Sequence, residues 1–315
     1  MYPAPYDVQD RHDQNSALIV DDKIYAYEEE KLTSVKGEST VRFPERSLMI
    51  GMKELNIYPK DVDLWVFPKP LDIALESMYL FFTWIVKAYL GDKASFEKWF
   101  KKKVKFVKHQ IAHASLAVYG SQFDKCAFLC LDGGGYLPDP RKFIFGEYSN
   151  DKFKVSKNTK GLKNIGVFHS MVADSLGYPG DENGKVSGLS GYGKVQPELV
   201  KRFEDFIEIT SNGIIFDRKR YGFTSVNLQK IKPKEYNRGK IFNSYPSDTN
   251  ILRVSSSYLP HDIAATGEMV FVNSILSLLK QLKKSTKLKK IVFSGGIFQH
   301  VSLNNSSLDS GIFEQ

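Results

Sequence analysis

Two histidines stand four residues apart in the segment KHQIAHASLAVYG, which runs from Lys108 to Gly120. On a helix, residues at this spacing lie on one face, with their side chains about 6 Å apart. The imidazoles of His109 and His113 can therefore reach a single metal ion. A bare pair at this spacing is more often two surface histidines without a role, so a metal site needs a further ligand from another element.

A carboxylate follows the next apolar segment. The run FLCLDGGG places Asp132 after a predicted buried strand, at the carboxyl end where α/β proteins hold their ligands. Two imidazoles and one carboxylate with open positions suit Fe(II), or Zn(II) and Mn(II) with added ligands. The alternative is that Asp132 only caps the turn beside Gly133. His109, His113 and Asp132 are thus candidate ligands of a divalent metal ion.

Two glycine turns follow predicted strands, DGGG at Asp132–Gly135 and FSGG at Phe293–Gly296. Such turns let backbone N–H groups approach phosphates closely, and the second opens a helix whose N-terminus favours anions. Together they predict a nucleotide held between two lobes, although neither matches the P-loop or G-x-G-x-x-G pattern. Tight strand-to-helix packing is the alternative. The predicted nucleotide contacts are Gly133, Gly134, Gly295 and Gly296.

Three more residues are candidates for phosphate binding or for catalysis because of the segments in which they lie. Lys185 lies in the glycine-rich stretch GDENGKVSGLSGYGK, which we predict to be a loop, with Gly188 close by. A lysine there can meet a phosphate as a point charge, and a flexible surface loop is the alternative. His12 precedes the first predicted hairpin and Lys36 follows it. His12 is a candidate acid/base group, although taken alone it is more typical of a turn residue.

Composition bounds the class of protein. The 315 residues are 42% apolar and 25% charged, which leaves room for two cores, and the net charge is +8. A basic chain can bind nucleic acid, a membrane surface or a phosphorylated substrate. The densest basic run, Lys98–His109, is more typical of a basic helix face than of a nucleic-acid patch. The apolar run Met78–Leu90 contains Lys87 and has 13 residues, against about 20 for a spanning helix. We therefore expect a mostly buried helix and no membrane partner, with an interfacial membrane helix as the alternative.

The cysteines and the N-terminus indicate a cytoplasmic protein. Cys126 and Cys130 lie on one predicted strand, where residues four apart are about 13 Å from each other, too far for a disulfide. We expect both to be buried thiols in a reducing compartment. The N-terminal segment lacks the character of a signal peptide.

The periodicity of apolar residues predicts alternating strands and helices, and therefore an α/β fold. Residues 196–258 are polar and irregular, and we expect an insertion or lid there. The other expected elements are a hairpin over 16–30, a helix beginning after Pro44, a short strand within 61–70, helix over 73–103, strands at 103–109 and 125–131, a hairpin over 141–159, a helix and a glycine-rich loop over 160–195, a long helix over 261–284, and a strand, turn and helix over 288–308.

Six segments follow one another in a specific order: HDQNSALIVDDKIYAYEEEKLTSVK, RFPERS, KHQIAHASLAVYGS, LDGGG, GKVSGLSGYG and VFSGGIFQHVSLN. In this order they resemble the O-carbamoyltransferases of the nodulation and antibiotic-tailoring type, over about residues 12–308. The resemblance implies an actin-like/sugar-kinase (ribonuclease H-like) two-lobe ATPase fold. It also implies transfer of a carbamoyl group from carbamoyl phosphate, through a carbamoyl-adenylate made with ATP, to a hydroxyl of a small-molecule or sugar acceptor.

The resemblance also implies roles for individual residues. His109, His113 and Asp132 would hold a divalent metal ion, most often iron, with zinc or manganese as alternatives. Lys185 and the Gly295–Gly296 turn would line the adenylate. Asn304 keeps the second asparagine position of that turn, whereas His300 replaces the first. His12 and Lys36 fall where relatives contact the carbamoyl group and the acceptor, so they are the candidate catalytic residues.

Relatives continue beyond the point where this chain stops, at Gln315. They carry another strand and a second acid–glycine turn that supplies a further metal ligand, followed by a YrdC-like domain for carbamoyl phosphate. We therefore expect a first lobe with the metal site over 1–155, an insertion that binds the acceptor over 156–258, and an incomplete second lobe over 259–315. Either the chain is a fragment of a longer protein, or a partner chain supplies the missing parts.

Two other functions are compatible with these motifs. The chain can be a degenerate nucleotide-binding or partner-dependent fragment without activity of its own. It can also transfer threonylcarbamoyl groups to tRNA, which its positive charge would suit. The residues of the motifs KHQIAHAS and GKVSGLSGYG favour the carbamoyltransferases that act on small molecules. We therefore do not expect a nucleic-acid partner.

Overall fold

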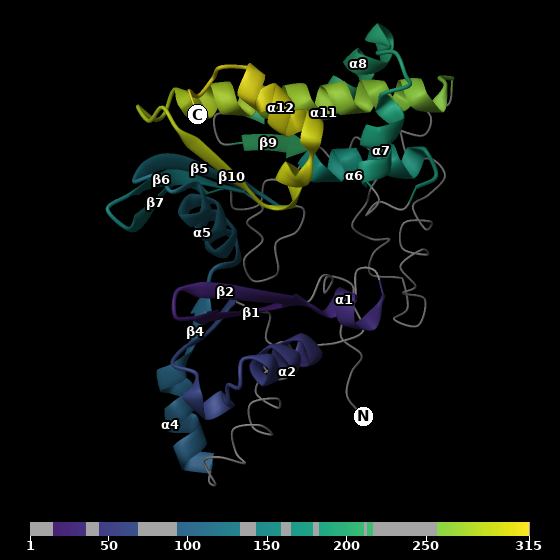
Figure 1. Ribbon diagram of the computed structural model, residues 1–315. Helices are drawn as coiled ribbons and strands as arrows, with labels where there is room; N and C mark the ends of the chain where they lie inside the picture. Colours follow the sequence, from purple (N-terminus) through teal and green to yellow (C-terminus); the bar gives the residue numbers. More distant parts are fainter. Residues whose placement is uncertain are drawn as a thin grey trace. The chain divides into compact units, whose positions relative to one another are not determined.

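The computed structural model describes residues 15–35, 44–68, 93–132, 143–158, 165–178, 183–210, 213–216 and 257–314 (Figure 1). The chain divides into two compact units, Met1–His109 and Gln110–Gln315. The expected mixture of helices and strands in an α/β chain is confirmed. The expected boundaries after residues 155 and 258 stay predictions.

The first unit begins with the predicted hairpin. Strands β1 (Asn15–Val20) and β2 (Lys23–Glu28) pair antiparallel. Their turn residues Asp21 and Asp22 have φ of 48° and 64°, as the two-residue turns that match the twist of a hairpin require. The short helix α1 (Glu29–Thr33) follows directly.

The rest of the first unit packs around this hairpin. Its further elements are α2 (Glu45–Glu54), the 3₁₀ turn η1 (Pro59–Asp61), β3 (Trp65–Pro68), α4 (Lys93–Lys103) and β4 (Val104–Val107). Strands β3 and β4 pair in parallel. The predicted helix after Pro44 and the strand that ends at Pro68 are confirmed, whereas the run Met78–Leu90 lies outside the described residues. The core consists of Leu18, Leu48, Met52, Trp65 and Val104.

A four-stranded sheet organises the second unit. Its order is β10 (Ile291–Ser294), β5 (Lys125–Leu131), β6 (Phe143–Ser149) and β7 (Lys152–Asn158). Strand β10 runs parallel to β5, and the other neighbours are antiparallel. The predicted hairpin over 141–159 is therefore confirmed.

Strand β5 is buried on both faces, which explains its continuous apolar run. Ala127, Leu129 and Leu131 belong to the main core cluster. The intervening residues Cys126, Phe128 and Cys130 pack in the cluster that includes helix α5. Both cysteines are buried and free, so the expectation of unpaired core thiols is confirmed.

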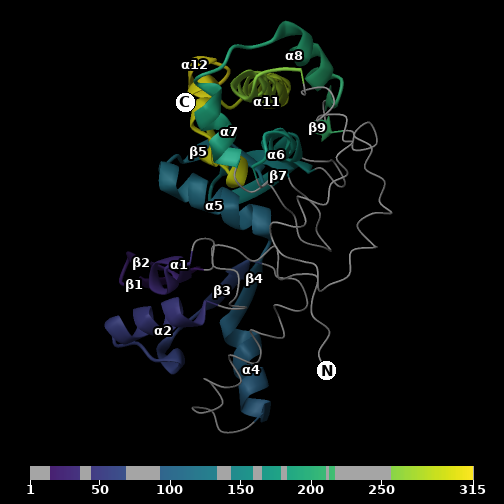
Figure 2. The same cartoon turned by 90° about the vertical axis from the view of Figure 1, so that its right-hand side faces the viewer.

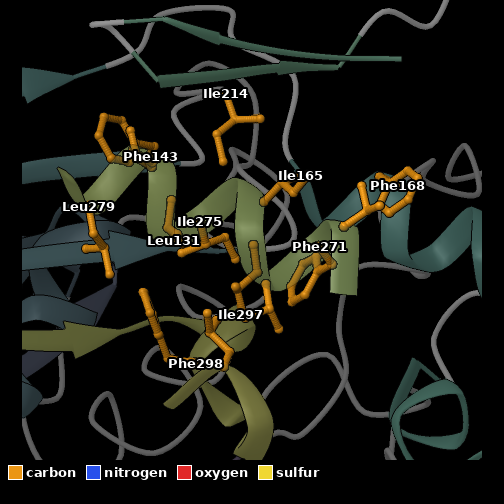
Figure 3. Packing of buried hydrophobic residues seen from close by; sticks show 14 of the residues in the cluster. Leu131, Phe143, Ile165, Phe168, Ile214, Phe271, Ile275, Leu279, Ile297 and Phe298 are labelled. Atoms are coloured by element: carbon orange, nitrogen blue, oxygen red, sulfur yellow. The ribbon is translucent and has the colours of Figure 1, made fainter. Parts of the chain in front are cut away.

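Helices lie on both faces of this sheet (Figures 1 and 2). Helix α11 contributes more buried residues to the main core than any other described element, and Figure 3 shows its Phe271, Ile275 and Leu279 among residues from the sheet and from the other helices. The remaining elements are α5 (His109–Ser121), α6 (Ile165–Ser175), α7 (Asn183–Ser190), α8 (Pro197–Glu204), β8 (Ile207–Thr210), β9 (Gly213–Phe216), α11 (Pro260–Lys283), the 3₁₀ turn η4 (Gly296–Gln299) and α12 (Val301–Asp309).

The prediction of a glycine-rich loop around Lys185 is wrong, because residues 183–190 form helix α7. Glycine and serine are weak helix formers, and the sequence NGKVSGLS contains four of them. Helix α7 packs against α11 and α6, and its Val186 is fully buried. Tertiary packing therefore overrides the low helix propensity of this segment.

Within the described part of the chain, α11 is the helix whose length and apolar character would suffice to cross a membrane, and 78% of its most apolar window is buried inside the protein. Such burial is typical of the central helix of a folded domain.

Leu278→Ala is expected to lower the free energy of unfolding by roughly 2–5 kcal/mol, the usual cost of a cavity at a fully buried leucine. Leu278 of α11 is 0% exposed in the main core cluster. Urea unfolding followed by circular dichroism measures the change. Leu308→Ala is the control, because Leu308 of α12 is 72% exposed, and a loss within about 0.5 kcal/mol is expected. Equal losses in the two variants would contradict the assigned core.

Candidate functional site

The structure brings His109, His113 and Asp132 together. Both histidines lie in the first turns of α5, and Asp132 follows β5 directly. One ligand atom from each side chain lies within 4.8 Å of the others. Nε2 of His113 is 3.5 Å from Oδ2 of Asp132, and the three side chains are partly exposed. They form an accessible group of two nitrogen donors and one oxygen donor.

The parallel pairing of β10 with β5 fixes the position of Asp132. Ser294 is the register partner of Cys130, so the glycine turn after β10 lies beside the end of β5. The backbone N–H of Gly296 donates to Oδ1 of Asp132 at 3.3 Å. Oδ2 faces His113. The two carboxylate oxygens therefore have separate partners, and the hydrogen bond orients the side chain toward the histidines.

Gly295 allows this close approach. It has φ of 92° and ψ of 162°, a region that is essentially restricted to glycine. A Cβ atom at this position would collide with the carbonyl oxygen of Leu131. The predicted glycine turn after β10 is confirmed. Glycine is required at position 295 because the end of β10 lies directly against the end of β5.

The donor set is compatible with a divalent metal ion. Zinc binds histidine nitrogen and carboxylate oxygen at about 2.0–2.2 Å, so neighbouring ligands of one ion lie roughly 3.0–3.5 Å apart. The distance of 3.5 Å between His113 and Asp132 falls at this limit. Metal-ligating carboxylates commonly carry an outer hydrogen bond, as Asp132 does from Gly296.

Those predicted nucleotide contacts that the structure describes lie on α7, in the turn after β10 and on α12. Lys185 is exposed on α7, with Nζ 5.4 Å from the centre of the Tyr178 ring, and Gly188 lies one turn further along the helix. Asn304 of α12 donates from Nδ2 to the carbonyl oxygen of Phe298 at 2.8 Å, so it holds the η4 turn in shape. The catalytic candidates His12 and Lys36, and the glycines Gly133 and Gly134, lie outside the described residues.

A second polar cluster, which sequence reasoning missed, lies in the interior of the second unit. It consists of His169 on α6, Glu268 on α11 and His300 at the start of α12, with ligand atoms within 4.8 Å of one another. Oε2 of Glu268 is 3.2 Å from Nε2 of His169 and 3.1 Å from Nε2 of His300. The one sequence signal was that His300 replaces an asparagine of the related turn.

Two serines complete this cluster. Ser187 Oγ lies 2.8 Å from Nε2 of His300 and donates to Oε2 of Glu268 at 3.2 Å. Ser302 Oγ donates to Oε1 of Glu268. We call His169, Ser187, Glu268, His300 and Ser302 the inner cluster. It connects α6, α7, α11 and α12 through one carboxylate.

The inner cluster keeps its carboxylate ionised. Burial acts to raise the pKa of the Glu268 carboxyl, but hydrogen bonds from His169, His300 and Ser302 outweigh it and hold this pKa well below its usual range. Burial also lowers the pKa of His169, against the opposing effect of its hydrogen bond to Glu268. A buried negative charge therefore lies beside an imidazole that favours its neutral form.

Residues 72–315 match the family described as carbamoyltransferase N-terminus. The chain is 24% identical to the nodulation protein NolNO of Sinorhizobium fredii, over 96% of this chain and 43% of that protein. It is also 24% identical to the uncharacterized protein MJ1051 of Methanocaldococcus jannaschii, over 94% and 51%. Among solved structures, HypF of T. kodakarensis matches with a TM-score of 0.44 and 11% identity, over 95% of this chain and 44% of that chain.

Proposed function

The chain belongs to the carbamoyltransferase N-terminus family, and from this premise we propose that it transfers a carbamoyl group to a hydroxyl of a small-molecule or sugar acceptor. The match of residues 72–315 to the family is the observation that carries the proposal. The order of the six sequence motifs supports the O-carbamoyltransferase branch and an actin-like two-lobe fold.

The source of the carbamoyl group is part of the same proposal. Carbamoyl phosphate would lose phosphate to give carbamate, whose oxygen would attack the α-phosphorus of ATP and release pyrophosphate. The carbamoyl-adenylate that results is the donor. This chain spans about half the length of the curated relatives it matches, 43% and 51%. A further segment or partner chain, with a second lobe and a YrdC-like domain, would make the adenylate, and this chain would use it. The two buried free cysteines support a cytoplasmic location.

In the transfer step, the acceptor oxygen attacks the carbamoyl carbon and the bond from that carbon to the phosphate oxygen breaks, so that AMP leaves. A divalent metal ion held by His109, His113 and Asp132 would supply Lewis-acid stabilisation of phosphate charge. Lys185 would neutralise the same charge from α7. His12 would take the acceptor proton, and Lys36 would contact the carbamoyl group.

AMP binding tests the nucleotide half of the proposal. Isothermal titration of the purified chain with AMP is expected to show saturable binding that weakens roughly 10–100-fold in Lys185→Ala, because a hydrogen bond to a charged group contributes about 1.5–3 kcal/mol. Lys201→Ala, which removes an exposed lysine of α8, is the control and should bind as the parent chain does.

Transfer itself is tested with synthetic carbamoyl-adenylate and a panel of sugar and aminoglycoside acceptors. We expect this chain to accelerate AMP release when an acceptor is present, with a carbamate ester as product. No binding of AMP and no acceleration with any acceptor would reject the proposal. Product formed on tRNA but on no small acceptor would favour the threonylcarbamoyl alternative.

A further inference from the structure

We propose that His169, Glu268 and His300 form a second metal site, which binds a divalent transition-metal ion of the zinc class with the Ser187 hydroxyl as fourth donor. The site is separate from the group of His109, His113 and Asp132. It does not depend on the proposed function, because it is argued from the inner cluster alone.

Donor atoms from four elements converge on one point in the inner cluster. Nε2 of His169 comes from α6, Oε2 of Glu268 from α11, Nε2 of His300 from the start of α12 and Oγ of Ser187 from α7. The distances from Oε2 of Glu268 to the other three atoms are 3.2, 3.1 and 3.2 Å. The two imidazole nitrogens and the carboxylate oxygen are of the types that bind zinc or ferrous ions, and the Ser187 hydroxyl would take the fourth position, which a water molecule occupies in open zinc sites.

These separations resemble the edges of a coordination tetrahedron. Ligands at about 2.0–2.1 Å from a tetrahedral zinc ion lie roughly 3.3–3.4 Å from one another. The three separations from Oε2 of Glu268 and the one between Ser187 and His300, from 2.8 to 3.2 Å, are a few tenths of an ångström shorter. Such shortening is expected where protons rather than a cation lie between the donors. A small outward movement of the side chains would therefore accommodate an ion.

The charge of the site also favours a cation. The Glu268 side chain is 10% exposed and that of His169 is 2% exposed. Within the described structure, the ion-pair partners of Glu268 are the imidazoles of His169 and His300, with no lysine or arginine among them. A buried carboxylate without a fixed positive partner is costly unless a cation or a proton compensates it. A divalent ion supplies that charge, and it would bind the neutral form of both imidazoles.

The proposed ligands also have hydrogen bonds and ring contacts with neighbouring residues, of the kind that orient metal ligands. Ser302 Oγ donates to Oε1 of Glu268, which leaves Oε2 directed toward the imidazoles. Nδ1 of His300 lies 3.4 Å from Ser302 Oγ and 3.4 Å from the backbone nitrogen of Leu303. The Phe271 ring lies 4.6 Å from the His169 ring and 5.1 Å from the His300 ring, centre to centre. This ring helps to shield the site from water.

The tautomer of His300 separates a metal site from a cluster held by hydrogen bonds alone. Without metal, a neutral His300 that donates from Nε2 to Glu268 must accept from Leu303 N–H at Nδ1. With metal on Nε2, the proton moves to Nδ1, which then donates to Ser302 Oγ. The two forms differ in which nitrogen of His300 carries the proton, so the nitrogen resonances of His300 report which one is present.

A metal here would join distant parts of the second unit. It would link α6, α7, α11 and the start of α12, which are otherwise held by packing and by the hydrogen bonds of the inner cluster. The segment Gly296–His300 has the first candidate site at one end, through the hydrogen bond from Gly296 to Asp132. Its other end supplies His300 to the inner cluster. The second site would therefore act structurally, by fixing the η4 turn.

The test is metal stoichiometry in the full chain. After chelation, the parent chain is titrated with Zn²⁺ and, separately, with Co²⁺, whose visible spectrum reports four-coordinate geometry. We expect two tightly bound equivalents. Asp132→Ala should lose one, and Glu268→Gln should lose the other with at least 100-fold weaker binding. Glu204→Gln, at an exposed glutamate of α8, is the matched control and should keep both.

The outcomes are distinguishable. Loss of the four-coordinate Co²⁺ spectrum in Glu268→Gln but not in Asp132→Ala supports the second site. Unchanged stoichiometry in Glu268→Gln overturns it, even if the first site binds metal as proposed. X-ray absorption of Asp132→Ala loaded with one equivalent of Zn²⁺ avoids any change to the inner cluster. Two imidazole ligands and a shift of the His300 nitrogen resonances are expected, and an absence of bound zinc in that variant overturns the site.

Discussion

Asp132→Ala is expected to remove one equivalent of bound divalent metal and to lower carbamoyl transfer at least about 100-fold. Losing an outer partner of a ligand already costs 10–100-fold in many metal sites, and loss of the ligand itself should cost at least as much. Asp132 is the carboxylate of the first candidate site and faces His113 at 3.5 Å. Elemental analysis of the purified variant measures the first effect, and carbamate formation from synthetic carbamoyl-adenylate measures the second.

Asp124→Ala is the matched control, because Asp124 is an exposed aspartate just before β5. It should keep the metal content and the rate of the parent chain. Asp132→Asn preserves an oxygen that can accept from Gly296 but removes the charge. We expect it to lose metal as Asp132→Ala does, with little change in the thermal midpoint. Full metal content in both Asp132 variants would show that this residue only caps the turn.

Gly295→Ala is expected to lower the free energy of unfolding of the second unit by about 2–6 kcal/mol. One part is backbone strain of about 1–3 kcal/mol, because φ of 92° with ψ of 162° is a glycine conformation. The other part is the collision of the new methyl group with the Leu131 carbonyl oxygen, for which overpacking costs of about 1–3 kcal/mol are typical. Urea unfolding measures the sum.

Gly311→Ala separates the two parts. Gly311 also has a positive φ, 59°, but a Cβ atom there meets nothing within 4 Å. Only the left-handed strain remains, at roughly 1–2 kcal/mol. If the two alanine variants lost the same stability, the contact between Gly295 and Leu131 would not hold in solution. If Gly295→Ala folds, we also expect weaker metal binding at Asp132, since the methyl group displaces the neighbouring N–H of Gly296.

The first candidate site could be predicted because its parts are local in sequence or lie at strand ends. His109 and His113 are four residues apart on one helix, so helical geometry alone brings them together. Asp132 follows a strand buried on both faces, which the unbroken apolar run from Cys126 to Leu131 indicated. A glycine turn after a second parallel strand was also visible. Local periodicity thus located this site without any knowledge of distant contacts.

Helix α7 shows where local signals failed. Its glycines and serines indicated a loop around Lys185, but Val186 is fully buried and the segment packs on α11 as a helix. The free energy that favours this helix comes from residues about 80 positions away in sequence, as in the bond from Ser187 to Glu268. Propensity cannot register such a contribution.

The sequence by itself determined the α/β alternation, the buried strand β5, the histidine pair on α5 and the family of the chain. Only the tertiary structure decided that His169, Glu268 and His300 meet, since Glu268 is 99 residues from His169 and 32 residues from His300. Each of these residues looks ordinary in its own segment. They become one polar site because α6, α11 and α12 pack together on the sheet, and burial then requires their polar atoms to find partners in one another or in a shared ion.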